Sequence, residues 1–179
     1  MEIKPEELIY KLQNGAPLPQ ANLLVVHGEE DYYRQQIVTA LPEAIFAGVA
    51  PEDRAITVFD KDTDLNELAS VINTYPFFSG QSLIVLKDEK LLAAKAESEA
   101  RKQQLDKLAD VLADIPDYCT VLVTASKLDK RTKLFKALKK QALLCECVSI
   151  KLNDLAQWLD GQAAIYSARW SYDAVGKIV

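Results

Sequence analysis

The sequence predicts an α/β fold in which a mostly parallel sheet of five strands is flanked by helices. Short apolar runs alternate along the chain with segments whose apolar residues recur at helical spacing. Strands that are apolar without interruption are typical of a parallel sheet covered by helices on both faces. The 179 residues, of which 49% are apolar and 26% charged, provide for one such domain and little more.

The first two pairs of strand and helix lie in the N-terminal half of the chain. Residues 23–28 form an apolar run that ends in glycine, and residues 31–46 follow it with helical spacing. We expect Pro42 to end this helix or to begin a fresh turn, because proline cannot donate the helical hydrogen bond. A second strand over residues 55–59 and a helix that begins near Asp64 repeat the pattern.

Three further strands and two further helices complete the predicted domain. The strands are expected over residues 83–86, 119–124 and 143–150, and the helices over residues 97–112 and 133–140. Helices between consecutive strands imply crossover connections, and therefore strands that run parallel.

The pattern changes after the last predicted strand. Asn153 can cap a short helix, and Ser171 or Asp173 can begin another. We therefore expect a doubly wound domain over residues 1–150 and the beginning of a small helical domain over residues 151–179.

Charge and composition exclude several classes of protein. A net charge of -5 and a pI near 5.0 argue against a surface that binds nucleic acid all over. The N-terminus lacks the profile of a signal peptide, three cysteines form no disulfide framework, and no apolar run is long enough to cross a bilayer. We expect a cytoplasmic protein that does not contact a membrane.

The loop after the first strand is the place where a nucleotide-binding α/β domain would hold phosphates. Here Gly28 is followed by three carboxylates at residues 29–31, with no lysine, and these would repel a triphosphate. Asp88 and Glu89 follow an apolar strand, as the magnesium-binding acids of such enzymes do, so a divergent nucleotide hydrolase remains the alternative. The single histidine and the three cysteines show no metal-ligand pattern. We expect no catalytic residue, no cofactor and no metal.

Basic residues are concentrated between residues 127 and 140 of this acidic chain. This basic cluster consists of Lys127, Lys130, Arg131, Lys133, Lys136, Lys139 and Lys140. Such a run either solvates a surface helix or forms a positive field for DNA or an acidic partner, and the sequence favours neither.

The loop between the helix that begins near Asp64 and the strand at residues 83–86 contains three aromatic residues, Tyr75, Phe77 and Phe78, around Pro76. Both phenylalanines could fill the core at the end of the preceding helix, which periodicity alone favours. Alternatively, at least one of them is exposed and anchors another protein.

Four segments, in this order and spacing, resemble the delta-subunit family of bacterial DNA polymerase III clamp loaders. They read LVVHGEEDYY at residues 24–33, YPFFSGQSLIVL at 75–86, KLDKRTKL at 127–134 and LNDLAQWL at 152–159. The resemblance implies an AAA+-like (P-loop NTPase-like) domain with a degenerate nucleotide site, then a helical lid domain. The family's C-terminal collar domain has no counterpart in this sequence, so the chain is expected to be a fragment.

The resemblance also implies a function. A chain of this kind has no enzymatic activity of its own and serves as a subunit of the DNA-directed DNA polymerase holoenzyme. It binds the sliding clamp and helps to open it for loading on primed DNA, together with other clamp-loader subunits. Phe77 and Phe78 match the positions of the family's clamp-binding wedge, and Tyr75 matches a flanking position.

Overall fold

The computed structural model describes residues 1–19, 21–87, 89–92, 99–149, 155, 158–161 and 163. The chain divides into two compact units, Met1–Cys147 and Val148–Val179. In the second unit, the described residues 158–161 are helical. The expected helix-starting residues Asn153, Ser171 and Asp173 lie outside the described residues.

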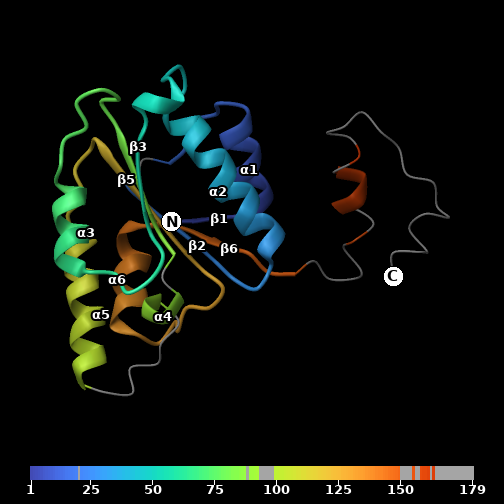
Figure 1. Cartoon of the computed structure of the whole chain (residues 1–179). Coiled ribbons are helices and arrows are strands. Elements are labelled where there is room, and N and C mark those ends of the chain that lie inside the picture. The colour runs from blue at the N-terminus through green and yellow to red at the C-terminus, as the bar shows by residue number, and fades with distance from the viewer. Residues whose placement is uncertain are drawn as a thin grey trace. The chain divides into compact units, whose positions relative to one another are not determined.

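The first unit alternates strands and helices along most of its length (Figure 1). Its strands are β1 (Glu2–Ile3), β2 (Leu23–His27), β3 (Ala55–Phe59), β4 (Ser82–Leu86), β5 (Cys119–Ala125) and β6 (Leu143–Glu146). Its helices are α1 (Pro5–Gln13), α2 (Asp31–Ile45), η1 (Pro51–Asp53), α3 (Leu65–Ile72), α4 (Glu89–Leu92), α5 (Glu99–Val111) and α6 (Lys133–Gln141).

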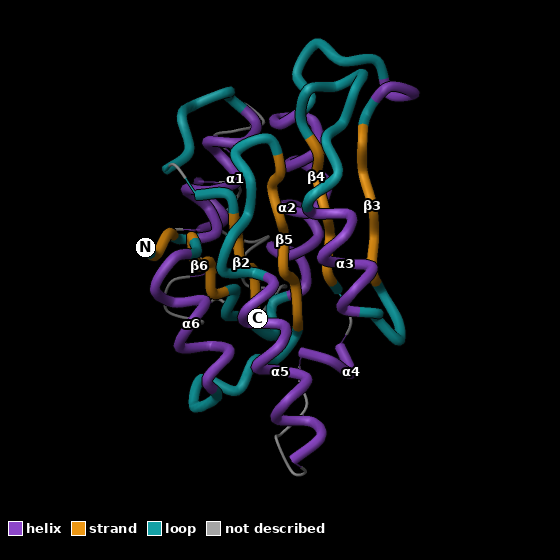
Figure 2. Tube along the Cα trace, turned by 90° about the vertical axis from the view of Figure 1, so that its left-hand side faces the viewer, coloured by secondary structure: helices purple, strands orange, loops and turns teal. Residues whose placement is uncertain are grey.

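The strands form one sheet in the order β1-β6-β2-β5-β4-β3, and every pair is parallel (Figure 2). The predicted α/β fold with a parallel sheet is confirmed, but the sheet has six strands instead of five. The additional strand is β1, in which Glu2 pairs with Leu144 and Ile3 with Cys145. Two residues are too few to show a periodicity, so only their pairing with β6 reveals them.

Helices cover both faces of the sheet. In Figures 1 and 2, α1 and α2 lie on one face, and α3, α5 and α6 lie on the other. On the second face, Leu68 of α3, Leu108 of α5 and Leu138 of α6 pack into one core cluster with the strands. Burial of each such leucine contributes about 1.5–3 kcal/mol to folding.

Two element boundaries differ from the prediction by several residues. Strand β6 ends at Glu146 instead of residue 150, because its partner β2 ends at His27, the residue that pairs with Glu146. Helix α2 continues through Pro42, so the expected helix end there is wrong. The N–H of Phe46 donates to the Pro42 carbonyl at 2.9 Å, and Leu41 and Phe46 are buried, which holds the last turn in place.

The parallel strands give the sheet two different edges. The amino edge is where the strands begin, and it includes the loop between α3 and β4. The carboxyl edge is where they end, and it includes the loop between β2 and α2. Within the described residues, no helix is long and apolar enough to span a membrane.

Candidate functional site

The aromatic loop, residues 73–81, connects α3 to β4 at the amino edge. Asp64 begins α3 by accepting a hydrogen bond from the N–H of Asn66 at 2.8 Å. At the other end, the side chains of Asn73 and Thr74 donate to the carbonyls of Ala69 and Ser70, each at 2.8 Å. These bonds satisfy carbonyls of the last turn, and the chain then leaves the helix as the aromatic loop.

The phenylalanines of the aromatic loop lie outside the core. Phe77 is 89% exposed and Phe78 is 87% exposed. In contrast, Pro76, which precedes them in the chain, is buried. The N–H of Gly80 donates to the Pro76 carbonyl at 3.2 Å, which closes a turn that includes the two phenylalanines. The structure therefore excludes the alternative in which both phenylalanines fill the core.

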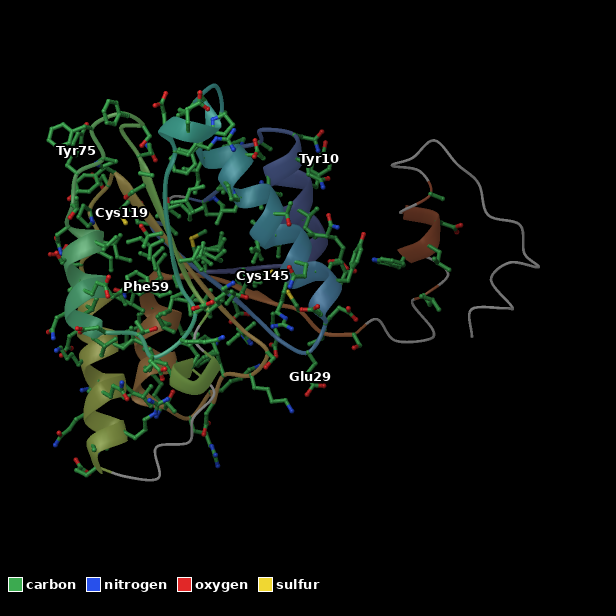
Figure 3. All side chains as sticks on the ribbon, in the orientation of Figure 1. Tyr10, Glu29, Phe59, Tyr75, Cys119 and Cys145 are labelled. Carbon is green, nitrogen blue, oxygen red and sulfur yellow. The ribbon has the colours of Figure 1, made fainter. Side chains whose placement is uncertain are left out.

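Tyr75 supports the flank of the aromatic loop. It is 53% exposed, and its ring stands edge-on to that of Tyr118, with centroids 5.1 Å apart. On its other side it meets the ring of Phe77 at 6.2 Å. Figure 3 shows Tyr75 at one edge of the sheet and Glu29 at the opposite one. No local pattern singles out Tyr118, because it is 43 positions from Tyr75 in the chain and contacts the loop only through the fold.

At the carboxyl edge, the loop after β2 uses its backbone donors within the protein. The N–H of Gly28 donates to the Ala125 carbonyl at 3.2 Å, and that of Glu30 donates to the Cys147 carbonyl at 3.1 Å. A phosphate-binding loop needs such N–H groups pointing at the ligand. Here the chain after β6 occupies that side of the loop.

Each of the three carboxylates of this loop has a partner within the protein. The Glu30 carboxylate accepts from the N–H of Tyr32 at 3.1 Å and so caps α2. Glu29 pairs with Lys127 at 3.3 Å, and Asp31 pairs with Arg34 at 2.9 Å.

His27 adds no positive charge at this place. Burial lowers the pKa of His27, whose ring stands edge-on to that of Phe135 at 5.8 Å. Its neutral form is therefore favoured at pH 7. The N–H groups of Gly28 and Glu30 and the cationic side chains of Lys127 and Arg34 are thus all engaged within the protein.

The residues of the alternative hydrolase lie largely outside the described part of the chain. Asp88 is not among the described residues, and of Glu89, the first residue of α4, only the backbone is described. Among the described residues, no group of three or more His, Cys, Asp or Glu side chains could hold a metal ion.

The buried thiols are accounted for by packing. Cys119, Cys145 and Cys147 are free and buried. The hydrogen bond to Cys147, together with burial, raises the pKa of Cys145. A neutral thiol in such surroundings behaves as a small apolar side chain.

The basic cluster lies on the connection after β5 and on α6, where carboxylates from other segments meet it. Lys130 pairs with Glu146 at 2.7 Å, and Lys133 pairs with Asp106 at 3.3 Å. The other ion pairs are Lys127 with Glu29, Arg131 with Asp129, and Lys139 with Glu2. The side chains of these five cations are more than half exposed, so each pair stabilises little, but together they weaken the positive field of the cluster. Lys136 lies on α6, with an exposed side chain.

Sequence comparison matches most of the first unit to one family. A family model described as DNA polymerase III, delta subunit, matches residues 24–148. The DNA polymerase III subunit delta of Bacillus subtilis (strain 168) is 26% identical over 132 residues, which cover 72% of this chain and 38% of that protein.

Two solved structures share the fold. The DNA clamp loader delta protein of Bacillus subtilis superposes with a TM-score of 0.68 at 22% identity, covering 90% of this chain and 48% of that one. A DNA polymerase III gamma subunit-related protein of Thermotoga maritima superposes with a TM-score of 0.51 at 13% identity, covering 88% and 49%. The chain thus spans less than half the length of each of these proteins.

Proposed function

The chain belongs to the DNA polymerase III delta subunit family, and from this premise we propose that it is a non-catalytic part of the clamp loader that binds the sliding clamp. In this function it helps to open the clamp for loading on primed DNA, as a subunit of the DNA-directed DNA polymerase holoenzyme. Its partners are the clamp and, in the assembled loader, the other loader subunits and primed DNA.

The observation that carries this proposal is the pair of exposed rings on the aromatic loop. Phe77 and Phe78 are adjacent, about nine-tenths exposed, and directly follow the buried Pro76. Isolated apolar residues on a surface are ordinary, but two adjacent phenyl rings on a supported loop form an apolar protrusion. Such a protrusion suits a hydrophobic pocket on a partner, where aromatic anchors contribute most of the binding energy.

The direct test is retention of the sliding clamp from the same organism by the immobilised 179-residue chain. Retention supports the proposal, provided that an excess of free chain competes for the clamp. If a correctly folded chain retains no clamp, the proposed function is wrong.

Lack of nucleotide hydrolysis is the second part of the proposal. The backbone donors of Gly28 and Glu30 are already bonded to carbonyls of the protein, and three acidic residues follow Gly28. Phosphoryl transfer depends on a loop, a lysine and a metal ion that hold the phosphates in place. The described loop supports the non-catalytic function over the divergent hydrolase.

We expect ATP and ADP with magnesium to show no binding in the micromolar range, because a phosphate would have to displace these backbone bonds and face the carboxylates of residues 29–31. Isothermal titration of the 179-residue chain checks this. Magnesium-dependent binding in that range, or phosphate density beside Gly28 in a soaked crystal, would instead support the hydrolase that uses Asp88 and Glu89.

Domain organisation belongs to the same proposal. We assign residues 1–150 to the AAA+-like domain and residues 151–179 to the beginning of the lid domain. The division of the chain after Cys147 supports a boundary near this place. A cytoplasmic location is part of the proposal, and the three free thiols are typical of a reducing compartment.

We propose that the basic cluster contacts DNA and binds it weakly. We expect weak binding of primed DNA that falls roughly tenfold between about 50 and 200 mM salt, as a few phosphate contacts would give. Reversing Lys136 and Lys139 to glutamate should remove most of it. Fluorescence anisotropy with labelled primed DNA measures both effects.

A matched control reverses Lys4 and Lys11, which lie outside the cluster, and changes the net charge equally. If both double variants lose DNA binding to the same extent, net charge alone is responsible. If the Lys136 and Lys139 reversal changes neither DNA binding nor the DNA-dependent activity of an assembled loader, the cluster only solvates α6.

A further inference from the structure

The aromatic loop has two stems, and both contact the same residue. The first stem leaves α3 at Asn73, and the second enters β4 at Ser82. Tyr118 lies in a different segment, directly before β5. Its position beside the stems follows from the pairing of β4 with β5, in which Ser82 is the partner of Cys119.

Tyr118 holds each stem with a different group. Its hydroxyl donates to the Asn73 carbonyl at 3.0 Å, so the side chain holds the first stem. Its own carbonyl accepts from the N–H of Ser82 at 2.8 Å, so the backbone holds the second. Between the stems, its ring packs edge-on against Tyr75 at 5.1 Å, and Tyr75 meets Phe77 in turn. One residue thus contacts the beginning, the flank and the end of the aromatic loop.

The segment that carries Tyr118 is itself fixed to the start of β2. The side-chain amide of Asn22 donates to the carbonyls of Ile115 and Pro116, each at 3.3 Å. The carbonyl of Asn22 accepts from the N–H of Val121 at 2.8 Å. The position of Tyr118 is therefore set by the central strands of the sheet.

We propose that Tyr118 is a positioning residue that holds the aromatic loop in the conformation in which Phe77 and Phe78 enter the partner. This inference rests on the proposed function. A loop that is already in its binding conformation loses less entropy on docking, and apparent affinity scales with the fraction of molecules in that conformation. Tyr118 is not part of the anchor formed by Phe77 and Phe78, because it acts on the loop through its contacts with Asn73, Tyr75 and Ser82.

The first test measures hydrogen exchange of the aromatic loop in the free 179-residue chain. Tyr118→Phe removes only the bond to Asn73 and keeps the ring, so we expect hydrogen exchange of the Thr74 and Gly80 amides, which are bonded to the carbonyls of Val71 and Pro76, to accelerate about fivefold. Exchange of the Val121 amide in β5 should stay unchanged. Tyr10→Phe, on the exposed face of α1, is the matched control and should alter none of the three amides.

The second test measures the affinity of the chain for the sliding clamp. Tyr118→Phe should weaken binding of the sliding clamp by about three- to fivefold, and Tyr118→Leu, which also loses the ring contact with Tyr75, by roughly tenfold or more. Tyr10→Phe should bind as the unaltered chain does. The inference is wrong if Tyr118→Phe accelerates exchange of all three amides equally or of none of them. It is also wrong if exchange in the loop becomes faster while the affinity for the clamp stays unchanged. If the unaltered chain does not bind the clamp, the proposed function fails, while the exchange experiment still decides whether Tyr118 holds the loop.

Discussion

Replacement of both Phe77 and Phe78 by alanine is expected to nearly abolish binding of the sliding clamp and to leave the thermal unfolding of the chain unchanged. Truncation of a central aromatic anchor typically costs about 2–4 kcal/mol, which corresponds to roughly 30-fold to 1,000-fold in affinity. The two rings are 89% and 87% exposed, so they bury little area in their own domain. Their removal should therefore affect the complex and spare the fold.

Titration calorimetry or surface plasmon resonance with the clamp, together with a melting curve, measures both effects. A matched control is the double change of Ile56 and Val58 to alanine on β3, since these apolar side chains are also exposed, at 39% and 51%. This control should bind the clamp normally. A folded Phe77 and Phe78 variant that binds as tightly as the original chain would remove the hypothesis. A large drop in melting temperature would instead mean that the rings support the core.

The second large effect concerns stability. Gly28→Ala should destabilise the domain by about 3 kcal/mol or more, because steric overlap and backbone strain add. Gly28 has a φ of +130°, and a Cβ built there would lie 2.0 Å from the carbonyl oxygen of Cys147. That carbonyl also accepts from Glu30, and the N–H of Cys147 donates to the His27 carbonyl at 2.6 Å. Relieving the overlap by moving the chain after β6 would break these bonds.

Urea unfolding followed by circular dichroism measures the change in the free energy of unfolding, and we expect a melting temperature lower by roughly 10 °C. Gly48→Ala is the matched control, since Gly48 has a φ of +82° but no atom within 4 Å of the added Cβ. It should cost only about 1 kcal/mol. If the two variants are equally stable, the contact with Cys147 does not constrain this loop.

Four of the six strands could be placed from the sequence because each is an uninterrupted or nearly uninterrupted apolar run. The predicted ranges for β2, β3, β4 and β5 agree with the structure to within about one residue. Helix α1 was missed, although Pro5 at its start and the buried Leu8 and Leu12, one turn apart, are signals of a helix. The end of β6 could not be read from its own residues, because its length depends on where β2 stops.

The carboxylates after Gly28 and the basic cluster differ in the same way in how much the sequence could predict. The carboxylates after Gly28 predicted a loop that repels phosphate, and that local electrostatic argument needs no tertiary structure. The basic cluster could be counted in the sequence, but its neutralising partners in distant segments could not be found there. Lys130 meets Glu146 across 16 positions of the chain, and Lys139 meets Glu2 from the other end of the unit.

By itself, the sequence determined the fold class, the family and the composition of the aromatic loop, because apolar runs, their spacing and the order of short motifs are local properties. Tertiary structure alone decided that Phe77 and Phe78 point outward while Pro76 is buried, and that Tyr118 contacts the loop that carries them. Outside a helix or strand there is no period that relates a residue's position to its direction. The direction is set instead by hydrogen bonds such as that from Tyr118 to Asn73, which link segments 45 residues apart in the chain.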